Sequence, residues 1–239
     1  MTISFPEFNT GRSGAADRNF TTAILPVQIV TTVSPSHNRP YRRVFKRMLD
    51  VTSILLAAPV IVPVVLGLAV AVARDGGSPF YTQMRIGRGG KRFKMWKLRS
   101  MVCDADARME AYLASDPEAR QEWDSTQKLK ADPRVTPFGR FLRKASLDEL
   151  PQLWNVFMGD MSLVGPRPMM INQQHLYPGS AYYALRPGIT GYWQTAGRNR
   201  TTFEARAEFD AAYEAELSFV NDVKVLVATV GVVVNGTGC

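Results

Sequence analysis

One apolar stretch decides how this chain is organised: residues 51–73, with the sequence VTSILLAAPVIVPVVLGLAVAVA. Its 23 residues carry no charge, and Thr52 and Ser53 are the clearly polar ones. A run of about 18 or more apolar residues is typical of a segment embedded in a membrane. We therefore expect one membrane-embedded segment on an otherwise water-facing protein.

Pro59 and Pro63 interrupt this run near its middle. An interior proline removes a backbone hydrogen bond and kinks or breaks a helix. Two shapes fit: a kinked helix that crosses the bilayer, or a re-entrant helix-break-helix that returns to its starting face. Basic residues flank both ends, in residues 39–47 before the run and from Arg74 and Arg85 after it. Because positive flanks prefer the cytoplasmic side, this pattern favours the re-entrant shape.

The segments around the run suggest three regions. Residues 1–40 are rich in Ser, Thr, Asn, Pro and Gly, which predicts a disordered or loosely ordered tail, with a short strand as the alternative. The basic residues at 39–47 alternate with apolar ones and predict a basic amphipathic helix on anionic headgroups. We therefore divide the chain into the tail, a membrane region at 41–74 and a cytosolic domain at 75–239.

The composition excludes several classes of protein. Of the 239 residues, 46% are hydrophobic and 21% are charged, as in ordinary globular proteins and unlike disordered or fibrous ones. The two cysteines, Cys103 and Cys239, are too few for a disulfide scaffold or a structural zinc site. The net charge of +8 predicts a polyanionic partner. Because no recognised nucleic-acid-binding motif is present, lipid phosphate or a phosphorylated substrate is favoured over nucleic acid.

Beyond residue 75 the pattern predicts a mixed α/β domain that is mostly helical. Large apolar and basic residues alternate at 93–101, which predicts a strand with one basic face. Helices are expected at 105–131 (two, the second opening at Pro117), at 138–143 and at 201–220. The apolar segment at 223–234 is either core or a second interfacial helix, with core favoured.

The strongest chemical signal is Asp148-Glu149 within the sequence SLDEL at 146–150. Adjacent carboxylates on a helix point about 100° apart, so they cannot oppose each other across a substrate. They can do two jobs at one site, one attacking a phosphorus and the other holding a metal. The alternative is structural: Ser146 as a helix cap and Glu149 as its capping-box partner.

Single basic residues lie before and after the Asp148-Glu149 pair in the sequence, in turns or beside aromatic residues. They are Lys94, Lys97, Arg99, Arg140, Arg143, Arg167, Arg186, Arg198 and Arg200. Guanidinium groups bind phosphate through two parallel hydrogen bonds, so rigid turns that carry arginine are suited to clamp it. No Walker A loop is present, and His37 and His175 are isolated, which argues against a histidine-based site.

Together these segments resemble the monotopic phosphoglycosyl transferases, the bacterial sugar transferase family that begins exopolysaccharide and glycan assembly. The resemblance covers roughly residues 42–239. It is carried by Lys46-Arg47 with Asp50, the apolar run, and the segments 80–83, 93–101, 132–136, 146–156, 159–168, 186–191 and 197–199. It implies transfer of a sugar-1-phosphate from a UDP-sugar to undecaprenyl phosphate, with release of UMP. Galactose and glucose are the expected sugars.

The resemblance also implies the roles of individual residues. Asp148 would be the nucleophile of a two-step reaction with a covalent phosphosugar intermediate, and Glu149 would bind Mg²⁺. Asp210, in an Asp-x-x-Tyr pattern with Tyr213, would contribute to substrate binding. The cations that would bind the substrate phosphates are Lys97, Arg99, Arg167, Arg186 and Arg198.

The resemblance further implies a re-entrant membrane helix broken at a Ser-Pro step. Pro63 matches that proline, Val62 stands at the serine position, and Pro59 offers a second break. The expected location is the bacterial inner membrane, with the catalytic domain in the cytoplasm. Undecaprenyl phosphate, a UDP-sugar and membrane lipid are the expected partners, and the oligomeric state stays open. The alternative function is a non-catalytic, basic, membrane-anchored scaffold.

Overall fold

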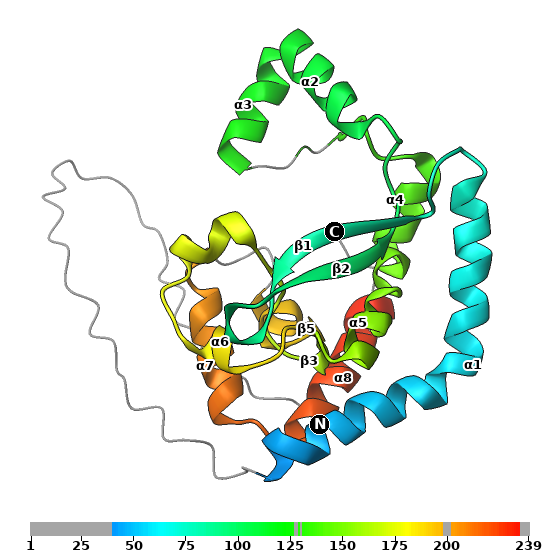
Figure 1. Cartoon of the computed structure of the whole chain (residues 1–239). Helices are drawn as coiled ribbons and strands as arrows, with labels where there is room; N and C mark the ends of the chain where they lie inside the picture. The colour runs from blue at the N-terminus through cyan, green and yellow to red at the C-terminus, as the bar shows by residue number, and fades with distance from the viewer. Residues whose placement is uncertain (1–39, 127–128, 130, 198–201, 235–239) are drawn as a thin grey trace, which may run out of the picture.

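The protein is described here by a computed structural model covering residues 40–126, 129, 131–197 and 202–234. The tail predicted at 1–40 lies outside these residues, except for Pro40. The prediction of a mixed and mostly helical α/β fold is confirmed (Figure 1). The helices are η1 (Tyr41–Phe45), α1 (Lys46–Ala73), η2 (Arg88–Gly90), α2 (Ala105–Ser115), α3 (Pro117–Thr126), α4 (Pro137–Lys144), η3 (Leu147–Glu149), α5 (Gln152–Met158), η4 (Ile171–Leu176), α6 (Ala181–Ala184), η5 (Trp193–Gly197), α7 (Arg206–Ala215) and α8 (Phe219–Val234). The strands are β1 (Phe80–Ile86), β2 (Arg92–Leu98), β3 (Ser162–Val164), β4 (Met169–Met170) and β5 (Gly188–Thr190).

The apolar run forms one long helix rather than two separate ones. Within the described residues, Tyr41–Ala73 is the helical stretch whose length and composition would allow it to cross a membrane. Figure 1 shows α1 bent into two legs, one along the base of the domain and one up its side. Pro59 and Pro63 lie inside the helix, and interior prolines are a known cause of such bends. The predicted break is therefore a bend in a continuous helix.

Both legs of α1 pack on the same domain. In the first leg, Asp50 is buried and accepts hydrogen bonds from the Ser162 hydroxyl and the Leu163 backbone amide, both in β3. In the second leg, Ala69 and Val72 pack in a buried cluster with Leu98 and Leu142. Between them, large apolar side chains are exposed: Leu55, Leu56, Val60, Val62, Val64, Leu66 and Val70. The ends of α1 are thus anchored while its middle presents an apolar surface.

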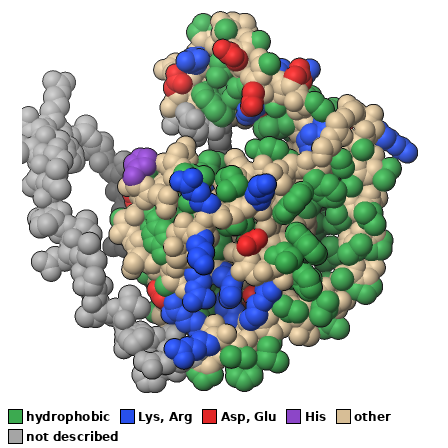
Figure 2. Space-filling model, viewed as in Figure 1, with side chains coloured by type: hydrophobic (Ala, Val, Ile, Leu, Met, Phe, Trp, Pro, Cys, Tyr) green, Lys and Arg blue, Asp and Glu red, His purple; other side chains and the backbone are tan. Residues whose placement is uncertain are grey.

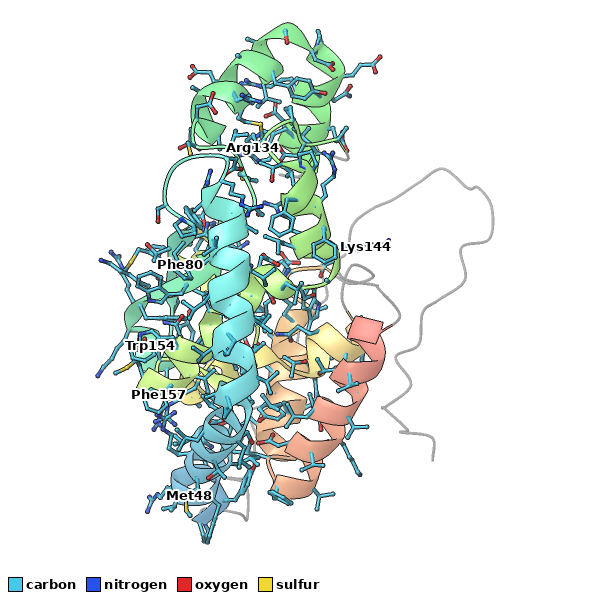
Figure 3. All side chains as sticks on the ribbon, turned by 90° about the vertical axis from the view of Figure 1, so that its right-hand side faces the viewer. Met48, Phe80, Arg134, Lys144, Trp154 and Phe157 are labelled. Carbon is cyan, nitrogen blue, oxygen red and sulfur yellow. The ribbon has the colours of Figure 1, made fainter. Side chains whose placement is uncertain are left out.

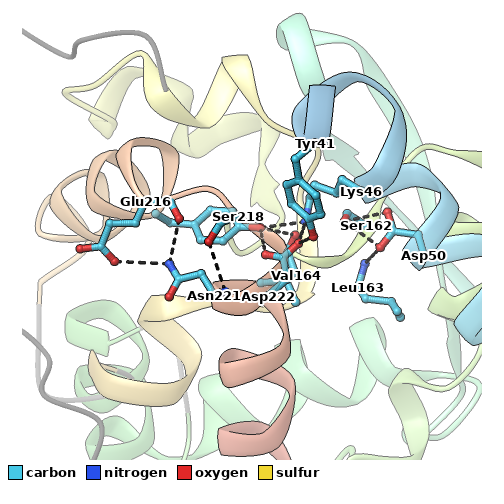
Figure 4. A network of polar contacts seen from close by, with 11 residues as sticks. Tyr41, Lys46, Asp50, Ser162, Leu163, Val164, Glu216, Ser218, Asn221 and Asp222 are labelled. Atoms are coloured by element: carbon cyan, nitrogen blue, oxygen red, sulfur yellow. Dashed lines mark hydrogen bonds and ion pairs between the residues drawn. The ribbon is translucent and has the colours of Figure 1, made fainter. Parts of the chain in front are cut away.

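The predicted headgroup-binding helix requires its basic residues to face outward. In η1 and the first turn of α1, not all of them do. Lys46 is buried, and its Nζ lies 2.6 Å from Asp222 Oδ2 and 2.8 Å from Tyr213 Oη (Figure 4). Arg42 pairs with Glu214 at 2.9 Å. Because a buried charge is tolerated only with a partner, these contacts join the first leg to α7 and α8. That part of the prediction is wrong for Lys46.

The β1–β2 hairpin is the scaffold on which the candidate site is built. The two strands pair antiparallel from Phe80 opposite Leu98 to Ile86 opposite Arg92, and β4 adds to the other edge of β1. Phe93 and Met95 are buried against α5. Side chains alternate along a strand, so Lys97 shares the face of Phe93 and Met95. Lys94 lies on the opposite, exposed face.

The remaining helices follow the sequence pattern with two differences. The helix expected at 201–220 is shorter: α7 ends at Ala215, and α8 has already begun at Phe219. Asp222 and Val225 of α8 are buried, whereas Val227 and Val230 are exposed, so α8 is core on one face only. Figure 1 shows α2 and α3 as a helical arm projecting above the rest of the domain.

Candidate active site

Asp148 and Glu149 lie on the short turn η3, between α4 and α5. Ser146 precedes them in a left-handed conformation, with φ 54° and ψ 22°, and its side chain caps no helix. An N-cap residue normally has an extended backbone, so the predicted capping box does not form. Helix capping by Ser146 and Glu149 therefore does not explain the acidic pair.

One lysine contacts both carboxylates. Lys97, at the end of β2, places its Nζ 2.7 Å from Glu149 Oε1 and 3.6 Å from Asp148 Oδ2. Asp148 is buried, with 7% of its surface exposed. Because Lys97 shares the face of Phe93 and Met95, the strand directs its ammonium group into this site. The structure thus brings together three of the residues predicted from the sequence.

The two carboxylates differ in proton affinity. Burial raises the pKa of Asp148 above its ordinary value, although Lys97 opposes that effect. Burial also acts to raise the pKa of Glu149, but the charge and hydrogen bond of Lys97, followed by Arg167 and Gln152, lower it further than burial raises it. Adjacent acids with divergent pKa values are suited to different roles.

Three arginines from separate elements form a cluster, in which Arg85 and Arg167 interact electrostatically with Glu149 of the dyad. Arg167, in the turn after β3, and Arg206, the first residue of α7, lie 5.4 Å and 4.2 Å from the centre of the Trp193 ring. Arg85 comes from β1, on the hairpin face shared with Lys97. Burial, and then repulsion from Arg167, lowers the pKa of Arg85 and that of Arg206 to about 10 each.

Two of these arginines carry unused hydrogen-bond donors. The Nε atoms of Arg85 and Arg206 are buried, and neither has an acceptor among the described residues. An unsatisfied buried donor costs roughly 1–3 kcal/mol, and more when it is charged. These donors belong to arginines that repel one another. They are therefore suited to bind the oxygens of a phosphate or diphosphate.

Sequence reasoning named neither Arg85 nor Arg206 as a site residue. Two weak signals were present. Arg85 stands in the strand that pairs with the basic strand, opposite Phe93. Arg206 lies four residues before Asp210, which places both on one face of a helix.

Asp210 lies in a small pocket beside these arginines. The cavity, of about 10 Å³, has room for roughly one water and is bounded partly by Arg167, Trp193 and Arg206. Asp210 accepts a hydrogen bond of 2.9 Å from the Tyr177 hydroxyl. Burial raises the pKa of Asp210 to about 7, against the lowering effects of Tyr177 and Arg206.

The other residues predicted with these do not join the cluster. Tyr213, three residues after Asp210, donates to Asp222 at 2.6 Å in the network that holds Lys46 (Figure 4). Arg198 lies outside the described residues.

Two further predicted arginines have structural partners. Arg99 donates to the carbonyls of Ser78 and Val72, at 2.8 and 3.1 Å, and pairs with Asp75 at 2.6 Å. It therefore fastens the end of α1 to β2. Arg186 donates to the Gly159 carbonyl at 2.9 Å and lines a different pocket.

The implied Mg²⁺ can be tested against the donors present. In the described part of the chain, no group of three His, Cys, Asp or Glu side chains is placed to hold a metal ion alone. Mg²⁺ at phosphate-transfer sites commonly uses one or two carboxylates, with substrate phosphates and waters as the other ligands. Glu149 fits that pattern as the protein carboxylate that would hold the ion together with the substrate phosphates.

Comparison with known proteins places the chain among sugar transferases. The sequence model of the family described as "Bacterial sugar transferase" matches residues 41–236. The chain is 44% identical to a "UDP-galactose-lipid carrier transferase" of Erwinia amylovora, over 88% of this chain and 44% of the relative. It is 43% identical to an "Undecaprenyl-phosphate galactose phosphotransferase" of Salmonella typhimurium, over 98% and 48%.

Relatives of similar length also match. The chain is 40% identical to "Exopolysaccharide production protein ExoY" of Sinorhizobium fredii, over 90% of this chain and 95% of the relative. By contrast, it spans less than half of the Erwinia and Salmonella proteins. The match to the family model covers most of the chain, and the residues that carried the resemblance fall within it. The chain belongs to the bacterial sugar transferase family.

Proposed function

We propose that this protein transfers a sugar-1-phosphate, of galactose or glucose, from a UDP-sugar to undecaprenyl phosphate and releases UMP. This would be the first membrane step of exopolysaccharide assembly. The observation that carries the proposal is the Lys97–Asp148–Glu149 cluster beside arginines with unused donors. Relatives named for galactose transfer to a lipid carrier support it.

The chemistry proceeds in two displacements. A carboxylate oxygen of Asp148 attacks the phosphorus that bears the sugar, and the bond from that phosphorus to the bridging oxygen breaks. UMP leaves with the bonding electrons, and a covalent aspartyl phosphosugar remains. A phosphate oxygen of undecaprenyl phosphate then attacks the same phosphorus. The Asp148 carboxylate departs unchanged, and the product is the lipid diphosphate sugar.

Neighbouring residues make this attack feasible. Lys97 favours the charged form of Asp148 and so opposes the effect of burial. Arg85, Arg167 and Arg206 would bind the diphosphate and the departing UMP, because guanidinium groups pair with phosphate oxygens. Mg²⁺, held by Glu149 and the substrate, would supply further charge neutralisation. Asp210 would keep Arg206 oriented toward the substrate.

The anchoring of α1 supports a particular membrane arrangement. A helix that crosses a bilayer has its ends separated by a hydrocarbon core about 30 Å thick. Both legs of α1 instead pack on one domain, through Asp50 at one end and Val72 at the other. We therefore propose a re-entrant helix in the inner membrane, with its bend in the lipid and the catalytic domain in the cytoplasm.

The test is UMP release in nanodiscs that contain undecaprenyl phosphate and Mg²⁺, with a panel of UDP-sugars. We expect release with UDP-galactose or UDP-glucose. Asp148→Asn should abolish it, whereas Asp124→Asn, an exposed carboxylate on α3, should not. No release from any donor would instead favour the non-catalytic scaffold. That alternative already lacks its capping role for Asp148 and Glu149.

A further inference from the structure

A second basic pocket lies at the turn of the β1–β2 hairpin. Its volume is about 480 Å³, and its lining includes Arg88, Lys91, Arg92, Phe93, Asp160 and Arg186. Phe93 stands four residues before Lys97 on β2, a separation of about 13 Å along the strand. Figure 2 shows Lys and Arg side chains gathered on this part of the surface. The lining includes none of Lys97, Asp148 and Glu149, so this pocket is distinct from the Asp148–Glu149 site.

The charge of this pocket is not balanced by the protein. Four cations line it together with one carboxylate, Asp160. Among the described residues, none of the four cations takes part in an ion pair. Burial, followed by repulsion from Arg88 and Arg47, lowers the pKa of Arg186. Cations gathered in this way attract an anion from solution or from a membrane surface.

The pocket borders the side of the molecule where α1 exposes its apolar residues. Arg47 donates to the Phe157 carbonyl at 2.6 Å, so the first leg of α1 meets the end of α5 at the pocket rim. Trp154 and Phe157 are exposed and stack at 5.7 Å. Figure 3 looks onto the α1 side and shows Met48, Trp154 and Phe157 along one edge of it. Exposed aromatic residues of this kind are typical of the headgroup level of a bilayer.

We propose that this pocket binds the phosphate headgroup of an anionic phospholipid such as phosphatidylglycerol. The inference rests on the proposed membrane placement of α1. Trp154 and Phe157, on α5 just before the pocket residues Gly159 and Asp160, would lie in the interface, which brings Arg88 and Lys91 to the level of lipid phosphates. The pocket, of about 480 Å³, has more space than a bare phosphate ion fills, which suits a lipid headgroup.

The test measures binding, so it does not depend on transferase activity. The full chain in neutral maltoside detergent is titrated by calorimetry with dihexanoyl phosphatidylglycerol, with the matching phosphatidylcholine and with inorganic phosphate. Two exposed cations are removed in R88A/K91A. The control R108A/R120A removes two exposed cations from the α2–α3 arm. A third variant, Arg167→Ala, removes a cation of the candidate active site.

Each cation near an anionic lipid surface contributes about 1 kcal/mol, so two predict a loss of roughly 30-fold. We expect saturable binding of phosphatidylglycerol that is weakened by about that factor in R88A/K91A. The R108A/R120A control and Arg167→Ala should stay within about twofold of the original affinity. Phosphatidylcholine should not bind, and inorganic phosphate should bind more weakly.

Three results would overturn the proposal. The first is equal affinity of R88A/K91A and the original protein. The second is an equal loss in the R108A/R120A control, which would indicate general charge attraction. The third is inorganic phosphate binding as tightly as phosphatidylglycerol, which would assign the pocket to a soluble anion. A failure of the transferase proposal would appear separately, as absent UMP release with lipid binding intact.

Discussion

Replacing Lys97 with methionine removes the one ammonium group that contacts both carboxylates of the dyad. Lys97 Nζ lies 3.6 Å from Asp148 Oδ2. At an effective dielectric constant of about 20, charges at that separation attract by roughly 4–5 kcal/mol. Because Lys97 is partly solvated and also pairs with Glu149, we take about half of that, or ~2 kcal/mol. This corresponds to roughly 30-fold in the equilibrium between the charged and the protonated form of Asp148.

The expected result is a shift in the pH profile of UMP release. Attack requires the charged form of Asp148, so activity falls as the pH drops through its pKa. Loss of Lys97 raises that pKa further, so the acid limb should move to higher pH. At pH values below the acid limb, Lys97→Met should therefore release UMP about 30-fold more slowly than the original protein.

Two variants make the Lys97 measurement specific. Lys97→Arg keeps the positive charge and should restore most of the acid limb. Lys94→Met removes a lysine from the opposite, exposed face of β2 and should leave the profile unchanged. An acid limb that stays in place in Lys97→Met would refute the assignment of Asp148 as the titrating nucleophile held by Lys97.

Three further predictions concern the frame and the cation cluster. Lys46→Met should lower the free energy of unfolding by about 3–5 kcal/mol in denaturant titration, because it leaves the buried Asp222 carboxylate without its cation. Changing both Pro59 and Pro63 to alanine should straighten α1 and detach one leg, which single-cysteine labelling from either side of the membrane would detect. Arg206→Gln should raise the KM for the UDP-sugar about tenfold, through the loss of one charge-assisted hydrogen bond, with the acid limb unchanged.

Each of these has a result that would contradict it. Unchanged unfolding in Lys46→Met would mean that its contact with Asp222 contributes nothing to stability. Unchanged labelling after the proline replacements would place the cause of the bend elsewhere. A normal KM in Arg206→Gln, measured beside the exposed control Arg108→Gln, would remove Arg206 from the substrate site.

Local sequence patterns were enough to predict the elements that carry a regular repeat of apolar and polar residues or a clear start signal. The alternation at 93–101 predicted β2, and Pro117 predicted the start of α3. The Asp148-Glu149 pair was found because its two residues are adjacent in sequence. The apolar run was equally plain, since its signal spans the whole of residues 51–73.

The tertiary contacts of single basic side chains could not be predicted from local sequence patterns. Lys46 and Arg99 resemble surface or phosphate-binding cations in sequence, yet tertiary contacts direct them to Asp222 and Asp75. Arg85 and Arg206 take their places through tertiary contacts, Arg85 with the Pro168 carbonyl and Arg206 with the Trp193 ring. Ser146 has the sequence of a helix cap, but the tight connection from α4 to η3 gives it a left-handed backbone. These outcomes depend on partners far away in the chain.

The central claim is that Asp148 carries the sugar phosphate between donor and lipid. The direct test is to incubate the protein with the UDP-sugar and Mg²⁺ in the absence of undecaprenyl phosphate. We predict a burst of UMP equal to the amount of protein, with a hexose-phosphate adduct found by mass spectrometry on the peptide containing Asp148. Adding undecaprenyl phosphate should then discharge the adduct. UMP release that strictly requires the lipid, with no adduct on Asp148, would contradict the claim and indicate direct transfer in one step.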